Sequence, residues 1–375
     1  EVPNPPKFLK GNPPNAQLEF EIDAAILAAA AKKSIPEGTR YGIKPDPNTE
    51  IRFKLRIPRD KREITAKKEH LSNPADMLVL KKPLRVLIVA SVASREYQFV
   101  RSLLVREMDK KRAELCIYLQ PLPGQPLRTE RVQDVPNERL LKSFPTRRKI
   151  EAKDASQEEK FISVSNYDLV LGFDPDWLQL TAGQRKNLRD WVDKDGGGLI
   201  IIANKLNMIE LVKPVLVKSG AVKDILDLLP VEVDFDKLSE PIDSTRPYPV
   251  QFEAIDPAWE FLNLEEDNPK IDSREAWNRF HYEIEDDAGK KSMLPKDAAP
   301  ERGYYRTVPV KSAKLNSVVI ARLPHPDLKI RDPRNRQQKD QPFIVEGKFG
   351  QGKVVWIGSG EMWRLRMYKE SYHER

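Results

Sequence analysis

Polar side chains follow four predicted strands, and they are the first candidates for chemistry in this chain. The strands are predicted at 86–90, 167–174, 199–203 and 354–357, where short apolar runs rich in Val, Ile and Leu end in loops. The carboxyl ends of parallel strands meet at one edge of a sheet, so we expect these side chains to converge there. They are Arg95, Glu96, Asp174, Asp176, Asn204, Lys205, Glu361 and Arg364.

Two interpretations of this set remain open at the level of sequence. The side chains either line a polar pocket for a small ligand or a partner's charged tail, or they are ion pairs and loop caps that tie the sheet edge together. In a pocket, Asp174, Asp176 or Glu361 could act as the base of a hydrolase or transferase. The two aspartates could also hold a hard cation, but Asp beside Pro is common in turns, so we predict no metal.

The remaining nucleophiles and potential metal ligands show no productive spacing. His70, His281 and His325 are scattered along the chain. The only cysteine, Cys116, lies in the apolar run 115–119 and is predicted to be a buried small hydrophobe. A single cysteine excludes an intramolecular disulfide and a cysteine-rich zinc site. We therefore predict no catalytic residue of these types and no cofactor.

Charge and hydropathy exclude two classes of partner for the chain itself. Lys plus Arg is 64 and Asp plus Glu is 57 in 375 residues, giving a net charge of +7 with both signs interspersed. The most basic run, 147–149, is followed at once by Glu151 and Asp154, so we predict no nucleic-acid partner. The longest apolar run, 24–31, is far below the roughly 18 residues of a membrane helix. Any membrane attachment is expected through segments outside this chain.

The elements that position the candidate residues begin with the segment 83–108. Its apolar run suits a strand buried on both faces, and Tyr97, Val100, Leu104 and Met108 then recur at helical spacing. Strand, loop and amphipathic helix open a doubly wound α/β domain. A second strand is predicted at 114–120. Further on, a capping-box pattern at 181–184 predicts a helix that stops at three glycines, 196–198. Near the end, a hairpin is predicted over 342–357.

Three parts are predicted from these patterns. Residues 1–82 begin with a Pro- and Asn-rich linker. Alternating apolar and polar residues then predict strands at 18–22 and 51–57, and a short helix is predicted at 24–33. We expect these elements to form a small β-sandwich-like module. The α/β domain is expected over 83–229 and 341–375. Weak periodicity and frequent proline make 230–340 an insertion or a β-rich subdomain.

Separate segments of this α/β part agree, in order, with one known family. They are LRVLIVASVASREYQFVRSLLVRE, YDLVLGFDPDW, WVDKDGGGLIIIAN and PFIVEGKFGQGKVVWIGSGEMWRLRMYKESYHER. Together they resemble the class I glutamine-amidotransferase-like fold, a flavodoxin-like α/β sandwich. The branch they resemble occurs in large bacterial envelope proteins, beside immunoglobulin-like or von Willebrand A modules and membrane helices. The resemblance covers 83–229 and 341–375.

The resemblance implies a domain without the family's chemistry. Active members carry a nucleophilic Cys after the fourth strand, assisted by a His near the chain's end. Here that strand runs into Ala203, Asn204 and Lys205, and an amide is no nucleophile. The expected function is then a non-catalytic interaction or scaffolding domain of a membrane-anchored protein. It would lie outside the cytoplasm in the cell envelope and bind other envelope proteins or modules of the same polypeptide. A cytoplasmic location is the alternative. Trp363, among apolar neighbours, is expected to anchor the core.

Overall fold

The computed structural model divides the chain into two compact units, Glu1–Pro83 and Leu84–Arg375. The structure describes residues 7–9, 15–17, 50–53, 56–58, 69–71, 75–78, 83–121, 134–150, 156–241, 245–253, 259, 262, 264, 272–285, 288–295, 298–331 and 338–367. Among these residues, no helix combines the length and apolar character needed to cross a bilayer.

The first unit contains short antiparallel strand pairs. The pairs are β1 (Lys7–Leu9) with β2 (Asn15–Gln17), β3 (Glu50–Phe53) with β6 (Ala75–Leu78), and β4 (Arg56–Pro58) with β5 (Glu69–Leu71). The strand predicted at 18–22 and the helix predicted at 24–33 lie outside the described residues.

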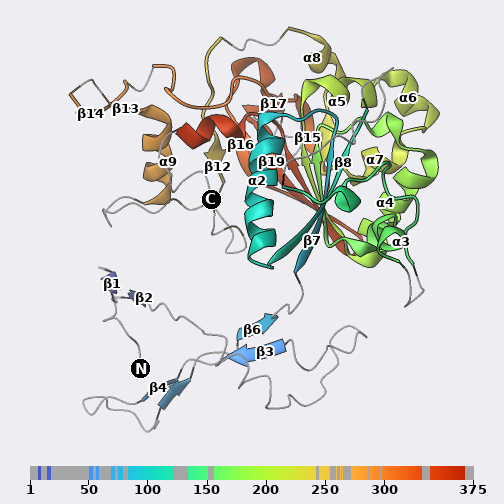
Figure 1. Ribbon diagram of the computed structural model, residues 1–375. Helices are drawn as coiled ribbons and strands as arrows, with labels where there is room; N and C mark the ends of the chain where they lie inside the picture. The colour runs from blue at the N-terminus through green and yellow to red at the C-terminus, as the bar shows by residue number, and fades with distance from the viewer. Residues whose placement is uncertain are drawn as a thin grey trace. The chain divides into compact units, whose positions relative to one another are not determined.

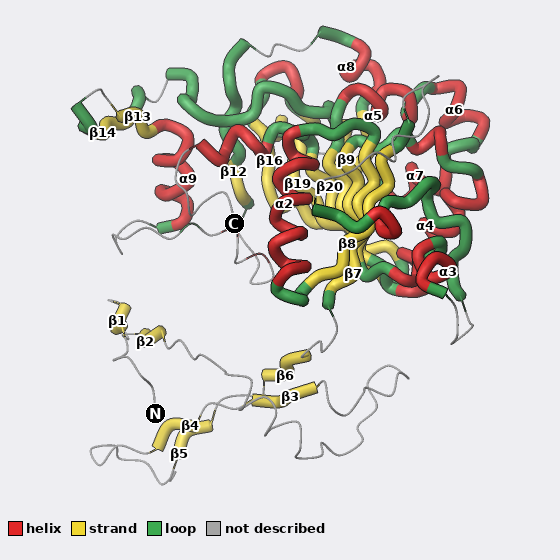
Figure 2. The backbone as a smooth tube through the Cα atoms, viewed as in Figure 1, coloured by secondary structure: helices red, strands yellow, loops and turns green. Residues whose placement is uncertain are grey.

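The second unit is built on a central sheet of eight strands in the order β12-β16-β19-β20-β10-β9-β7-β8 (Figure 2). Their bounds are β7 Leu84–Ala90, β8 Ala113–Leu119, β9 Leu169–Phe173, β10 Gly198–Ile202, β12 Gln251–Phe252, β16 Ser317–Leu323, β19 Gln341–Phe349 and β20 Gly352–Ile357. Neighbours from β8 to β20 pair in parallel, and β19, β16 and β12 continue the sheet antiparallel. In chain order the parallel strands stand 2-1-3-4-5, the order of flavodoxin-like domains. The predicted α/β class is confirmed.

Helices cover both faces of this sheet, as the continuous apolar run of β7 requires. Val86, Ile88 and Ala90 pack in one core cluster with α2 (Arg95–Asp109). Leu87 and Val89 point to the other face, into the larger cluster that includes residues of α4 (Ala182–Asp195). Figure 1 shows α2 on one side of the strands and the group from α4 to α7 on the other. A strand with two buried faces has no polar alternation, which is why its sequence is apolar throughout.

The helix limits follow the predicted caps. Thr181 and Gln184 form a complete capping box at the start of α4, and Gly196 ends the helix with a φ of 76°. Gly197 is required by packing, because a Cβ there would lie 2.2 Å from the Trp191 ring. The remaining helices are α3 Gln157–Phe161, α5 Lys205–Leu211, α6 Pro214–Ser219, α7 Lys223–Leu228, α8 Phe235–Ser239 and α9 Ser273–Tyr282.

Residues 230–340 contribute to the same sheet as the α/β core. They supply β12 and β16, and they form smaller antiparallel pairs at its margin. These pairs are β11 (Val231–Val233) with β15 (Val310–Ala313), β13 (Glu283–Glu285) with β14 (Lys291–Met293), and β17 (Ile330–Arg331) with β18 (Gln338–Lys339). This segment also brings the loop 304–308 to the carboxyl ends of the strands, where Val308 N donates to Gly358 O at 2.8 Å.

Candidate functional site

A cavity of about 450 Å³ lies where the carboxyl ends of β10 and β20 meet the loop before β15. Its walls combine three cationic side chains, one carboxylate, hydroxyl and amide groups, and two aromatic rings. The lining residues are Ala203, Asn204, Lys205, Tyr305, Arg306, Thr307, Val308, Gly358, Ser359, Gly360, Glu361, Trp363 and Arg364. The cavity therefore occupies the sheet edge at which the sequence places its candidate residues.

Glu361 ties the loop to the end of β20. Its Oε2 accepts hydrogen bonds from the backbone N–H groups of Tyr305 and Arg306, at 2.8 and 2.9 Å. Its Oε1 lies 3.4 Å from Arg364 Nη2. The carboxylate is thus held by two backbone donors and a guanidinium, which suits a positioning role in the wall of the cavity.

Glu96 is a buried carboxyl group directly behind this wall. Only 3% of the residue is exposed, and Oε1 accepts a hydrogen bond from the backbone N–H of Trp363 at 3.1 Å. A Cβ built on Gly360 would lie 4.0 Å from Glu96 Oε2 and 3.8 Å from Asn204 Nδ2, so Gly360 lies between these two side chains. Burial raises the Glu96 pKa to about 7, the Trp363 N–H opposes the increase, and the Glu361 charge adds to it.

Trp363 lies at the rim of the cavity, where two arginines contact its ring. The guanidinium carbons of Arg95 and Arg364 are 4.2 and 4.6 Å from the ring centroid, and that of Arg364 is also 4.7 Å from the Tyr305 ring. The residue is half-buried. The expectation that Trp363 anchors the core is therefore wrong: its ring is held by cation–π contacts at a polar edge.

Asp174 and Asp176 are not among the residues that line the cavity, although they follow the neighbouring strand β9. Asp174 adopts a φ of 44°, and its Oδ2 accepts from the Asn207 N–H at 3.3 Å. Its burial raises its pKa to about 7. Asp176 caps the turn 177–179 by accepting from the Leu178 N–H at 3.0 Å, and its own N–H donates to Gln120 at 2.7 Å. Both aspartates act in the structure as loop supports.

Asn204 follows β10, at the approximate position of the family's nucleophile. Its side chain accepts from the Lys205 N–H at 2.8 Å and caps α5. Its φ of −139° is extended, so the sharp left-handed turn on which such nucleophiles stand is absent at this residue. Lys205 Nζ donates to the backbone carbonyl of Glu240 at 3.2 Å.

The eight predicted residues therefore divide into three groups. Asn204, Lys205, Glu361 and Arg364 line the cavity. Arg95 and Glu96 contact its rim through Trp363. Asp174 and Asp176 brace the adjoining strand end.

Sequence analysis missed four lining residues with polar side chains: Tyr305, Arg306, Thr307 and Ser359. Arg306 comes from a stretch without periodicity, so no pattern pointed to it. Ser359 stands between two glycines directly after β20, a position at which strand-end loops often carry function, and that signal was available. Among the described residues, no group of three or more His, Cys, Asp or Glu side chains is placed to hold a metal ion.

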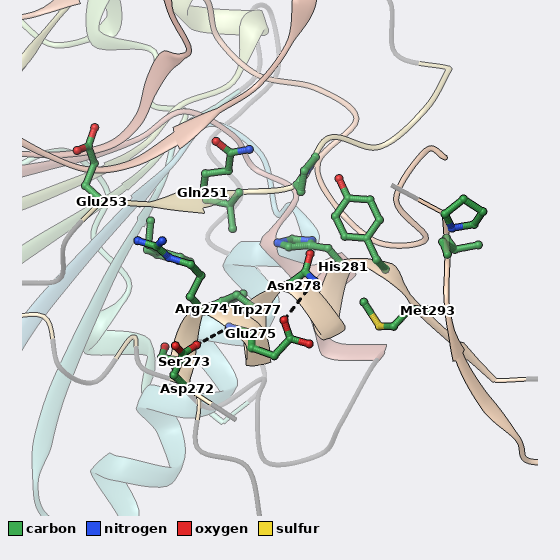
Figure 3. A pocket seen from close by; sticks show the side chains of 16 residues that line it. Gln251, Glu253, Asp272, Ser273, Arg274, Glu275, Trp277, Asn278, His281 and Met293 are labelled. Atoms are coloured by element: carbon green, nitrogen blue, oxygen red, sulfur yellow. Dashed lines mark hydrogen bonds between the residues drawn. The ribbon is translucent and has the colours of Figure 1, made fainter. Parts of the chain in front are cut away.

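A larger cavity, about 1310 Å³, lies away from the parallel strand ends (Figure 3). It is lined by β12, α9 and the segment around Met293. Two of its carboxylates, Glu253 and Glu275, are ion-paired with Arg322 and Arg279. Its floor is formed by Trp277, whose ring lies 4.7 Å from that of Phe252. We place the candidate site at the smaller cavity, because it lies at the carboxyl ends of the parallel strands and carries three cationic side chains.

Comparison with known proteins identifies distant structural neighbours and no family. No protein-family model and no curated protein matches the chain. A cytoplasmic protein from Salmonella typhimurium LT2 aligns over 78% of this chain and 96% of its own, with 13% identity and a TM-score of 0.40. A ThuA-like protein from Bacteroides uniformis ATCC 8492 aligns over 75% and 84%, with 10% identity and a TM-score of 0.32. Another, from Parabacteroides merdae ATCC 43184, aligns over 74% and 79%, with 10% identity and a TM-score of 0.29. TM-scores this low carry no argument about activity.

Proposed function

We propose that the unit Leu84–Arg375 is a non-catalytic interaction domain whose strand-end cavity binds a small ligand or a partner's charged tail. The observation that carries this proposal is the position of Asn204 and the hydrogen bond that its side chain forms. It lines the cavity at the end of β10, yet its side chain is engaged in capping α5. A cavity is thus present where the resembled family has its nucleophile, and an amide stands in place of that nucleophile, which supports a binding role.

The proposal extends to cellular context through the sequence resemblance. We propose that this unit belongs to the degenerate amidotransferase-like branch found in membrane-anchored bacterial envelope proteins, where other envelope proteins or modules of the same polypeptide would be its partners. The test is fractionation of the cells that produce the native protein. Recovery with the envelope membranes supports this placement, and recovery in the cytoplasmic fraction alone refutes it.

The test of the non-catalytic assignment is ammonia release from glutamine. We expect the wild-type protein to release no more ammonia than a heat-denatured sample. Cys116→Ala is the matched variant, because Cys116 is the only thiol and is buried in β8. Substantial release by the wild type would overturn the assignment. Loss of that release in Cys116→Ala would further show that the thiol is the nucleophile.

One observation favours a second candidate function, a hydrolase or transferase with a carboxylate base. Glu96 is buried beside the cavity wall and has a pKa of about 7, which is the range a general base needs at neutral pH. This residue replaces Asp174, Asp176 and Glu361 as the best-placed base. The test is hydrolysis of p-nitrophenyl acetate and p-nitrophenyl phosphate by the wild type and by Glu96→Gln. Turnover that the variant loses would favour the enzyme over the binding domain.

A further inference from the structure

We infer that the strand-end cavity binds an acidic group, a carboxylate or a phosphate, through Lys205, Arg306 and Arg364. The inference rests on the proposed function in taking this cavity as a binding site, and it adds the chemistry of the ligand. Its basis is the balance of charge in the walls, together with polar atoms that lack partners.

The cavity walls carry more positive than negative charge. Three cationic residues face one carboxylate, that of Glu361. This carboxylate is already bound by two backbone N–H groups and by Arg364. Within the part of the chain that the structure describes, neither Lys205 nor Arg306 forms an ion pair, and Arg306 is exposed. An anion entering the cavity would therefore meet donors whose charges are not neutralised.

Two buried polar atoms at the cavity also lack hydrogen-bond partners among the described residues. Ser359 is 2% exposed and lines the cavity, and its Oγ is unpartnered. The Nε–H of Arg364 is buried and unpartnered as well. Buried donors in native proteins are nearly always satisfied by protein, water or ligand. A hydroxyl and a guanidinium N–H match the acceptor oxygens of a carboxylate or phosphate, and they lie in the same cavity wall as Lys205 and Arg306.

The same walls disfavour the other ligand classes. A cation would be repelled by the three positive side chains. The Trp363 ring already contacts two guanidinium groups, at 4.2 and 4.6 Å, which disfavours stacking of a nucleobase on it. Glu96, the carboxyl group behind the wall, has a pKa raised to about 7 by burial, so it is partly protonated at neutral pH and repels an anion less than a fully ionised carboxylate would.

The test is isothermal titration calorimetry with four probes at constant ionic strength. Sodium phosphate and sodium succinate carry the two kinds of acidic group, glycerol is the neutral probe, and putrescine is the cationic probe. We expect phosphate, succinate or both to bind the wild type, with glycerol and putrescine giving no binding heat. Comparison of the two anions decides between phosphate and carboxylate.

Arg306→Ala is the decisive variant, because its exposed side chain can be removed while the backbone N–H bond to Glu361 is kept. Loss of one charged donor should weaken binding by about tenfold or more. Arg274→Ala is the matched control: it removes the same charge from an exposed arginine of the larger cavity and should leave affinity unchanged. Ser359→Ala should weaken binding as well, through loss of its hydroxyl.

The outcomes separate this inference from the proposed function. The inference is overturned if neither anion binds at millimolar concentration, or if Arg306→Ala and Arg274→Ala weaken binding equally. Binding of glycerol or putrescine alone would also overturn it, while leaving a binding domain in place. Hydrolysis of the p-nitrophenyl substrates would refute the non-catalytic assignment without affecting the anion site.

Discussion

Replacing Glu96 by Gln should stabilise the second unit above neutral pH and have little effect in acid. Glu96 lies behind the cavity wall with its Oε1 bound to the Trp363 N–H, and a glutamine carbonyl can accept the same bond. The amide does not titrate. The variant therefore removes the buried negative charge while keeping the shape and the hydrogen bond of the side chain.

The sign and size of the effect follow from the Glu96 pKa, which is about 7 in the folded state against 4.5 for the free group. The folded protein holds this proton more tightly, so the contribution of Glu96 to stability is fully present below pH 4.5 and is lost as the pH rises through 7. The full difference corresponds to at most about 3 kcal/mol, and solvent near the cavity reduces it to about 1–2 kcal/mol. The charge of Glu361 raises the Glu96 pKa and that of Arg364 lowers it. Both residues are present in the wild type and in Glu96→Gln, so the comparison isolates the Glu96 charge.

The assay is urea unfolding of the wild type and Glu96→Gln from pH 5 to pH 8. We expect the difference in unfolding free energy to grow over this range and to level off above pH 7. Glu138→Gln removes an exposed carboxylate and should show no such growth. A difference that stays constant from pH 5 to pH 8 would refute the reasoning, because it would show that Glu96 has the same pKa in the folded and unfolded states.

Three further substitutions, the last with a matched control, test other features of the second unit by the same unfolding measurement. Asp174→Asn should stabilise the protein above pH 7 and not below pH 4, because burial raises this pKa from 3.8 to about 7 and Asn tolerates the left-handed φ. Trp363→Ala should cost about 1–2 kcal/mol, the sum expected from two cation–π contacts, whereas a core tryptophan would cost about 3–5 kcal/mol. Gly197→Ala should destabilise by about 1–3 kcal/mol or more, because its Cβ would overlap the Trp191 ring, while Gly220→Ala meets no neighbouring atom and tests only the strain of a positive φ.

The parallel core of the second unit could be predicted from sequence because its strands are short and apolar on both faces. The run 86–90 lies inside β7, and the capping box at 181–184 marks the start of α4. The final hairpin could also be predicted, because two glycines, 350 and 352, stand between two strand patterns. In the structure these strands pair as β19 and β20, and Gly350 adopts a φ of 58°. In each case a short sequence pattern favours the same local structure that the packing of the sheet requires, so the pattern alone is enough to predict the element.

The antiparallel extension of the sheet could not be predicted in the same way. β12 has two residues, and β16 pairs with β19 through register irregularities. β16 does contain a short apolar run, 318–321, but Val318 is exposed and nothing in the sequence assigns this run to the edge of the core sheet. Arg306 illustrates the consequence for the site: it reaches the cavity because backbone bonds to Glu361 and Gly358 hold its loop, and such long-range pairing leaves no periodic trace in the sequence.

Trp363 was misinterpreted for a related reason. Its neighbours in sequence include Met362 and Leu365, which suggested a core position. Its neighbours in space are Arg95 from α2 and Arg364 from its own turn. An indole can satisfy both surroundings, because its face attracts guanidinium groups while its edges pack against apolar atoms. Sequence proximity alone does not distinguish the two placements.

The two interpretations of the strand-end residues, a pocket or a set of structural ties, apply to different strands of one edge. After β9, Asp174 and Asp176 are used to hold Asn207 and Gln120. After β10 and β20, Asn204 and Glu361 form hydrogen bonds as well. Here, however, the two loops and the segment 305–308 line the 450 Å³ cavity. These hydrogen bonds restrict the loops before any ligand arrives. A ligand would then order little of the chain on binding, and the entropy cost of binding would be small. A binding site of the proposed kind would therefore be favoured by the same contacts that also serve as structural ties.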